Sequence, residues 1–228
     1  MKIIDAHSHI TYITHLQQSG VVGTVCCATD DKQWSMLTVL MNQDKQLYGA
    51  FGVHPWFVYL VDDKVIQRLE KILKTDSKYM VGEIGLDKYK PDMDKQLDIF
   101  IKQFDLAVKL KRTMFLHCVG AWDKILHVLK QYKKVNLPII VIHGFNANQK
   151  ITKQLLQYEN IMFSVGKNNI NGRNSRIEQI PDNRILVETD GKSDVVLKDS
   201  IKQIANIKNK TNIGEIIFDN TQRILNNE

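Results

Sequence analysis

The chain has 228 residues, of which 43% are hydrophobic and 25% charged, and its formal net charge is +6. This composition excludes collagen-like, low-complexity and strongly disordered proteins, and no apolar run is long enough to span a bilayer. The length fits one α/β barrel, so we expect a single domain over residues 1–228.

The three cysteines, Cys26, Cys27 and Cys118, are odd in number and form no CxxC pair. A disulfide framework is therefore not expected, and the N-terminus lacks the apolar core of a signal peptide. Both features indicate a reducing, cytoplasmic location. The net positive charge favours an anionic partner such as nucleic acid, although a solvated, lysine-rich surface explains it equally well.

Short apolar runs alternate along the chain with segments of helical spacing. The runs predict eight strands, at residues 2–7, 21–29, 47–54, 80–86, 113–118, 138–144, 161–165 and 184–189. The spacing predicts helices at 13–16, 34–41, 61–73, 97–111 and 122–132, and two closing helices over 194–228. The polar, basic stretch 167–176 is predicted to be a loop.

Strands that alternate with helices form parallel βαβ units, and eight repeats at this length predict a closed (β/α)8 TIM barrel. An open, doubly wound sheet is the alternative. The sequence has no GxGxxG turn between a strand and a helix, which argues against that alternative.

Polar side chains of kinds that bind metals stand within or at the end of five of these runs. They are His7, His9, Glu83, His117, His143 and Asp190. The carboxyl ends of barrel strands meet on one rim, so these side chains are expected to converge there as one metal site. Taken singly, each has a plainer interpretation: a salt-bridged Glu, a core His bound to a carbonyl, or an Asp at a helix N-terminus.

Other polar or aromatic residues fall near the same rim. His54 ends the third predicted strand and is expected to line the mouth, as a phosphate contact or as a support for a ligand. Asp5 stands two residues before His7 and is expected to lie beneath it and to orient a ligand. Trp56 and Tyr89 follow strand ends, where they can stack on bases or simply cap the barrel.

The segments DAHSH, GVHP, VGEIGLD, FLH, HGF, IPDNRILVETD and DNTQRIL, in this order, resemble the TatD family of metal-dependent deoxyribonucleases. The resemblance runs from Lys2 to about Leu225. It implies a barrel of the amidohydrolase-like, metal-dependent hydrolase type. It also implies two divalent ions, Mg2+ or Mn2+, with Zn2+ as a further candidate.

The resemblance assigns each predicted ligand to an ion. His7, His9 and Asp190 are expected to bind one ion, and His117 and His143 the other. Glu83 is expected to bridge the two ions, and Glu83 and Asp190 to act as the catalytic carboxylates.

The chain departs from the family pattern beside the ligands. Val119 stands where an Arg is usual, and Gly191 is followed by Lys192 where Pro is usual. These departures affect the substrate side more than the metal site. The segment FSVG at 163–166 resembles the divergent QatD-like branch, which is linked to anti-phage defence.

We therefore expect a hydrolase that cleaves phosphodiester bonds of DNA, single-stranded or with free ends, by a two-metal mechanism with a shared hydroxide. Lys88 and Arg173 follow strand ends and are expected to contact the DNA backbone, unless they are solvated loop charges. Two alternatives stay open. One is hydrolysis of a small ester, lactone or amide in the same site, and the other is a binding subunit of a defence complex with protein partners from the same operon.

Overall fold

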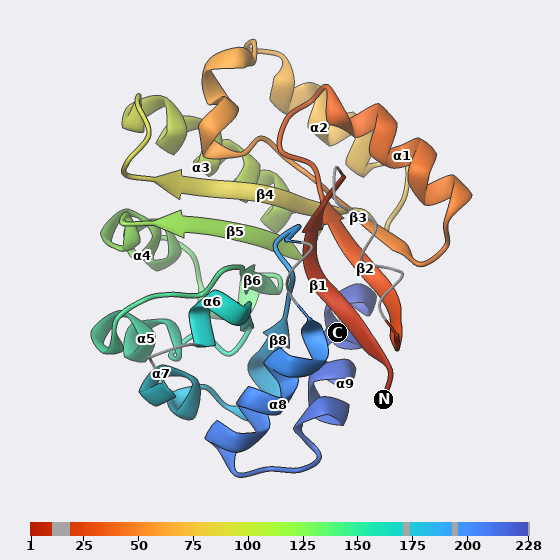
Figure 1. Ribbon diagram of the computed structural model, residues 1–228. Coiled ribbons are helices and arrows are strands. Elements are labelled where there is room, and N and C mark those ends of the chain that lie inside the picture. Colours follow the sequence, from red (N-terminus) through yellow and green to blue (C-terminus); the bar gives the residue numbers. More distant parts are fainter. Residues whose placement is uncertain (11–18, 171–173, 193–195, 228) are drawn as a thin grey trace.

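Each of the eight strands pairs in parallel with the next one along the chain, in the order β1 to β8. The structure is a computed structural model that describes residues 1–10, 19–170, 174–192 and 196–227. The strands are β1 (Ile3–His9), β2 (Val21–Cys27), β3 (Leu47–Phe51), β4 (Met80–Asp87), β5 (Met114–Val119), β6 (Ile140–Ile142), β7 (Ile161–Val165) and β8 (Ile185–Val187). Figure 1 shows them at the centre of the molecule with the helices outside.

The sheet curls so that β8 returns beside β1. The backbone N–H of Asp190, just after β8, donates to the carbonyl of His7 at 3.0 Å. The N–H of Thr189 donates to the Asp5 carboxylate, also at 3.0 Å. The strands therefore form a nearly closed TIM barrel, and the predicted fold class is confirmed.

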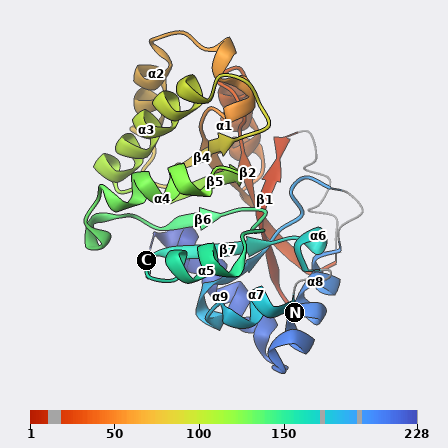
Figure 2. The same cartoon turned by 90° about the vertical axis from the view of Figure 1, so that its left-hand side faces the viewer.

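Helices cover the outside of the barrel. They are α1 (Gln33–Gln43), α2 (Val65–Leu73), α3 (Met93–Leu110), α4 (Trp122–Lys130), α5 (Gln149–Leu155), α6 (Lys167–Ile170), α7 (Asn174–Gln179), α8 (Leu197–Lys208) and α9 (Ile213–Asn226). The described residues also contain the short 3-10 helices η2 (Pro55–Leu60), η3 (Lys134–Asn136) and η4 (Asp182–Arg184). Figure 2 shows α1, α2 and α3 at one end of the molecule and α7, α8 and α9 at the other. Within the described residues, no helix combines the length and the apolar character needed to cross a membrane.

Two apolar cores flank the strands, as expected for strands buried on both faces. The larger core lies between the strands and the helices, and the smaller one fills the barrel with side chains such as Ala6, Val25, Phe115 and Leu186. Ile224 of α9 packs into the smaller core. Helix α9 therefore supports the barrel interior as well as β1 and β8.

The predicted strands and most predicted helices are present, with ends shifted by a few residues. The prediction that 167–176 is a loop is wrong, because its described parts contain α6 and the first half of α7. Ile170 in α6 and Ile177 in the second half of α7 are buried, and this packing overrides the polar composition of the segment. Helix α5 was not predicted. The helix predicted at 13–16 lies outside the described residues.

Strict alternation of side chains fails in β1 and β4, and both irregularities place candidate ligands. Between Val81 and Ile84, β4 has one residue more than its partner β5. The side chains of Val81 and Ile84 both face the outer core. The extra residue turns Glu83 into the barrel, where simple alternation from Val81 would not keep it. In β1 the two residues Ala6 and His7 stand between Asp5 and Ser8, where β2 has a single residue between the partners Thr24 and Cys26.

Gly85 allows β4 and β5 to approach closely beside Glu83. Its backbone φ is +146°, and an added Cβ would lie 1.9 Å from the carbonyl oxygen of His117. A side chain at this position must therefore displace the strand that carries His117. Gly85, the second glycine of the GEIG segment, is therefore required for the packing of β4 against β5.

We expect Gly85→Ala to lower the free energy of unfolding by at least about 2 kcal/mol, because the methyl group overlaps the His117 backbone. Urea denaturation followed by circular dichroism measures this change. Gly166→Ala is the matched control, because an added Cβ there has no contact closer than 3.4 Å. Equal stability of the two variants would contradict the predicted close approach.

Candidate metal centre

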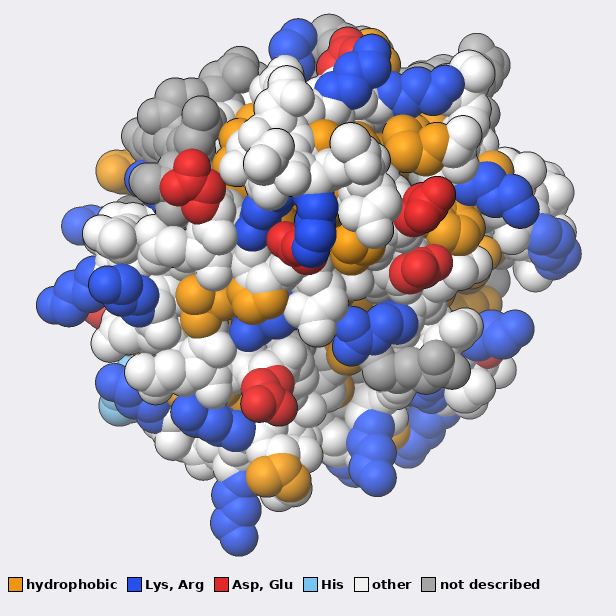
Figure 3. All heavy atoms as spheres, turned by 90° about the horizontal axis from the view of Figure 1, so that it is seen from below, with side chains coloured by type: hydrophobic (Ala, Val, Ile, Leu, Met, Phe, Trp, Pro, Cys, Tyr) orange, Lys and Arg blue, Asp and Glu red, His pale blue; other side chains and the backbone are white. Residues whose placement is uncertain are grey.

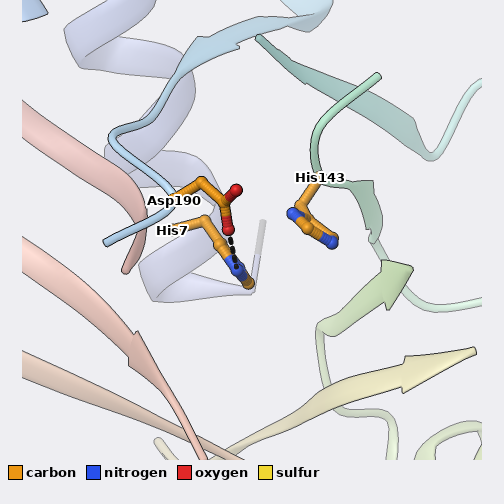
Figure 4. A group of neighbouring side chains, drawn as sticks. All are labelled: His7, His143 and Asp190. Atoms are coloured by element: carbon orange, nitrogen blue, oxygen red, sulfur yellow. Dashed lines mark ion pairs between the residues drawn. The ribbon is translucent and has the colours of Figure 1, made fainter. Parts of the chain in front are cut away.

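The six predicted ligands lie together at the carboxyl end of the barrel. They come from β1, β4 and β5 and from the segments just after β6 and β8. Figure 4 shows His7 and Asp190 joined as an ion pair, with His143 beside them. The ring centroids of His7 and His143 are 4.1 Å apart, and Asp190 Oδ1 lies 3.8 Å from His7 Nε2. Residues 136 positions apart in sequence thus share one small space.

The two carboxylate oxygens of Glu83 face different imidazoles. Oε2 lies 3.3 Å from His7 Nε2 and 3.6 Å from His9 Nε2. Oε1 lies 2.9 Å from His117 Nδ1 and 2.8 Å from His143 Nε2. The carboxylate therefore stands between two groups of nitrogen donors, the position of a bridging ligand.

Asp190 faces the first of these groups. Its Oδ1 is 3.5 Å from His9 Nε2, and its Oδ2 accepts a hydrogen bond from Lys192 Nζ at 2.6 Å. Burial opposes ionisation of Asp190, but His9, His7 and Lys192 outweigh it and hold its carboxyl pKa well below the usual value. Asp190 is therefore an anion at neutral pH.

The charge on Glu83 dominates the electrostatics of the centre. Burial raises the pKa of Glu83, but the imidazoles of His143, His54 and His7 outweigh burial and hold it well below the usual value. Burial likewise opposes a charge on His143, yet Glu83 and Glu188 raise its pKa well above that of a free imidazole. Burial and the charge on His143 lower the pKa of His7. The carboxylate is thus ionised, and it attracts positive charge into a buried space.

The residues present fit divalent metal ions. Nε2 of His7 is buried and makes no hydrogen bond within the described part of the chain, although two carboxylates lie near it. Three sets of three donors each have ligand atoms within 4.8 Å of one another: His7, His143 and Asp190; His7, His9 and Glu83; and His54, Glu83 and His117. Imidazole nitrogens and carboxylate oxygens are the donors that Zn2+ and Mn2+ accept.

Cys27, at the end of β2, contacts both histidines of the HSH segment. Its carbonyl accepts a hydrogen bond from His9 Nδ1 at 3.2 Å, which leaves Nε2 of His9 as the free donor atom. Its thiol sulfur lies 3.3 Å from His7 Nδ1. The sequence indicated only that this cysteine would be buried, which it is, and gave no sign of these contacts.

Glu188 is a second supporting residue that sequence reasoning missed. It is fully buried, its Oε1 accepts the Gly144 N–H at 2.6 Å, and it lies 3.8 Å from His143 Nδ1. An acidic residue within the apolar run RILVET is the same signal that pointed to Glu83. That signal could have identified Glu188 as well.

Asp5 is fully buried, but its carboxylate contacts backbone and a hydroxyl rather than an imidazole ring. Oδ1 accepts the N–H groups of His7 and Thr189 at 3.2 and 3.0 Å, and Oδ2 accepts the Thr189 hydroxyl at 2.6 Å. Burial raises the pKa of Asp5 to about 7 against the effect of these donors. Asp5 therefore links β1 to the chain after β8, next to two candidate ligands.

The three residues predicted to contact the substrate, His54, Lys88 and Arg173, differ in where they lie relative to the metal centre. His54 is buried, and its Nε2 lies 3.1 Å from Glu83 Oε1. Lys88 is exposed just beyond β4 and does not line the cavity described below. Arg173 lies outside the described residues. Of these three residues, only His54 is placed at the centre.

A cavity of about 480 Å³ opens above the centre, a size that suits a small ligand or part of a larger one. Its walls include His54, Trp56, Glu83, His117 and Asp190. A larger cavity, about 720 Å³, lies at the opposite end of the barrel around Arg112 and Ile224. None of the candidate ligands lines the larger cavity, so we assign the chemistry to the smaller one.

A parallel barrel with imidazoles and carboxylates gathered at its carboxyl rim defines the class of metal-dependent TIM-barrel hydrolases. Residues 4–226 match the family described as TatD related DNase. The chain therefore belongs to the TatD family, as its motifs predicted.

Named relatives include nucleases and hydrolases. The human 3'-5' RNA nuclease TATDN2 is 32% identical over 160 residues, which are 66% of this chain but 21% of the human protein. The uncharacterized metal-dependent hydrolase YjjV of Escherichia coli is 26% identical over 208 residues, 83% of this chain and 79% of YjjV. The 3'-5' ssDNA/RNA exonuclease TatD of Yersinia pseudotuberculosis is 26% identical over 140 residues, 60% of this chain and 53% of that protein.

Solved structures have the same fold. The crystal structure of YjjV from E. coli superposes with a TM-score of 0.86 at 22% identity and 98% coverage of both chains. A TatD family hydrolase from Entamoeba histolytica gives 0.82 at 15% identity, again with 98% coverage of both. At these identities the comparison supports the fold alone.

We expect Asp5→Ala to lower the free energy of unfolding by about 2–4 kcal/mol, because two buried N–H groups lose their acceptor. Asp5→Asn should cost less than half as much, since its carbonyl oxygen can keep those N–H groups and the Thr189 hydroxyl can turn to accept. Thermal and urea unfolding measure both changes. Equal effects of the two substitutions would contradict this role.

Proposed function

We propose that this metal-dependent hydrolase is a nuclease that cleaves phosphodiester bonds of nucleic acid with free ends, and that DNA is its substrate. The observation that carries the proposal is the position of Glu83, whose two oxygens face separate groups of imidazoles at the floor of an open cavity. Relatives named as 3'-5' RNA and ssDNA/RNA nucleases support a nucleic-acid substrate.

The ligand assignment follows the two sides of Glu83. We assign His7, His9 and Asp190 to one ion and His117 and His143 to the other, with Glu83 between them. His143 also lies against His7, so the two groups adjoin. We further propose that residues 1–228 form one domain built around this site.

The donor set favours some metals over others. Four of the six assigned ligands are imidazoles, whereas Mg2+ prefers oxygen ligands and retains several waters. Imidazole suits Zn2+, and Mn2+ accepts both nitrogen and carboxylate oxygen. We therefore propose Mn2+ or Zn2+ ahead of Mg2+ as the ions of this site.

Bound divalent ions would supply hydroxide at neutral pH and neutralise charge on the phosphate. Asp190 contributes negative charge facing His7 and His9. Its Oδ1 lies 3.8 Å from His7 Nε2 and 3.5 Å from His9 Nε2, a position that supports its proposed role as a ligand, and its proposed catalytic role stays a prediction.

His54 is suited to support Glu83 rather than to contact the substrate directly. Its Nδ1 accepts the backbone N–H of Trp56 at 3.2 Å, so the ring proton lies on Nε2, which is 3.1 Å from Glu83 Oε1. Burial lowers the pKa of His54 to about 4, and the ring is therefore neutral at pH 7. A neutral donor can orient the Glu83 carboxylate without adding a buried charge.

The QatD-like placement, the role in phage defence and the cytoplasmic location stay predictions. The first two are tested by co-purification with the products of neighbouring genes and by plaque assays with the intact operon, and the location is tested by cell fractionation. Loss of protection in a Glu83→Gln strain would support a catalytic role in defence. Unchanged protection would favour the binding-subunit alternative.

We expect the chelated protein to bind two equivalents of Mn2+ or Zn2+, and its melting temperature to rise by roughly 10–20 °C at metal concentrations about 100-fold above Kd. Isothermal titration calorimetry and thermal scans measure both effects. His7→Ala should lose at least one equivalent, whereas His127→Ala on the exposed face of α4 should behave as the wild type. Full stoichiometry in His7→Ala would contradict the assignment.

We expect the metal-loaded protein to shorten end-labelled single-stranded DNA, and Glu83→Gln to reduce the rate at least about a hundredfold. Gel assays should include duplex DNA and single-stranded RNA, because the named relatives include an RNA nuclease. Hydrolysis of an ester panel without cleavage of any nucleic acid would instead establish a small-molecule hydrolase. Cleavage that persists in Glu83→Gln would show that the activity comes from elsewhere.

A further inference from the structure

Two exposed aromatic side chains stand at the rim beside the metal centre. Trp56 lies in η2 after β3, Tyr89 lies just after β4, and 43% and 78% of their surfaces are exposed. Trp56 also lines the cavity that contains Glu83, and its ring centroid is 5.2 Å from that of His54. A large apolar ring is thus open to solvent next to the candidate reaction centre.

The indole of Trp56 is held in place from below. Its Nε1–H donates to Asp87 Oδ2 at 2.6 Å, and Asp87 is buried. The other oxygen of Asp87 accepts the Tyr89 N–H at 2.9 Å, and the Asp87 N–H donates to buried Gln96 at 2.9 Å. A buried carboxylate is costly unless it is well hydrogen-bonded, and here it anchors a ring that remains exposed.

Cations accompany this ring. Lys90 Nζ lies 4.2 Å from the Trp56 ring centroid, and Lys88 follows the same strand. Neither lysine forms an ion pair with any residue that the structure describes. A fixed aromatic ring with the Lys90 ammonium over one face matches the two parts of a nucleotide, a planar base and a phosphate.

Figure 3 shows lysines and arginines spread over one face of the molecule, with acidic side chains between them. The distribution of charge on that face therefore does not indicate where a nucleic acid would bind. The pairing of an anchored ring with nearby cations at the rim is a local feature. It adjoins the cavity through Trp56 itself.

We propose that Trp56 is a base-stacking site, which receives the nucleobase next to the phosphate at the metal centre in place of the Lys90 ammonium, while Lys90 contacts a neighbouring phosphate. This inference rests on the proposed nuclease function and names how that site holds its substrate. Stacking accepts any of the bases, so the site confers a preference for nucleotides over abasic sugar phosphates rather than for one sequence. Asp87 acts as a positioning residue, because it fixes the ring that touches the base.

The test compares binding of two phosphorothioate chains of equal length to the metal-loaded protein, an oligothymidylate and the same backbone with abasic sites, by competition anisotropy. The wild type should prefer the oligothymidylate about tenfold. Trp56→Leu should bind both chains equally, and Trp56→Phe should keep a clear preference because it keeps a planar ring. Tyr59→Leu, an exposed aromatic of the same η2 that does not line the cavity, should retain the wild-type preference.

Lys90→Ala should weaken both chains alike and reduce the salt dependence of binding by about one phosphate contact. Thermal scans confirm that each variant is folded. An undiminished preference in Trp56→Leu, no preference in the wild type, or no binding of either chain would overturn the stacking site. Preference through Trp56 without cleavage of any nucleic acid would refute the proposed nuclease function and leave the stacking site intact.

Discussion

The ionised carboxylate of Glu83 buried among imidazoles is the interaction on which the rest of this structure depends. The Glu83 side chain is 2% exposed, and an ion so far from water is stable only with close partners of opposite charge or with metal ions. His7, His117 and His143 reach it from three other parts of the barrel wall. Closing the barrel and assembling the centre are therefore one event, because the carboxylate gains its partners only when distant strands meet.

The strands that carry the centre depart from regular geometry where they do so. Each extra residue, in β1 and in β4, interrupts the in-and-out alternation, and the one in β4 places Glu83 toward the mouth. Gly85 permits the close packing of β5 that this arrangement requires. Asp5 and Cys27, neither of which is an assigned ligand, then hold the backbone and the rings in place. The supporting contacts are as specific as the ligands themselves.

The rim differs from the floor of the cavity in what it can recognise. The floor consists of ionisable groups held rigidly by strands, which suits chemistry on a phosphate. The rim, formed by η2 and the segment after β4, presents an anchored indole with the Lys90 ammonium over its ring. Asp87 joins the two levels, because it binds the Trp56 indole and lies 3.9 Å from His117 Nε2. The fold thus connects the wall of the cavity to a candidate metal ligand through one carboxylate.

The sequence by itself determined the order of strands and helices, the barrel class, the family and the set of six side chains that converge. Apolar periodicity and motif spacing are local properties, and they can be identified in the sequence without knowledge of the fold. Only the tertiary structure decided which oxygen of Glu83 faces which histidine, and that Cys27, Glu188 and Asp87 support the site. It also decided that the polar segment around Ile170 and Ile177 is largely helical, because those two side chains find a core to pack against. Such pairings depend on register shifts and on closure between residues more than a hundred positions apart, and no short stretch of sequence encodes them.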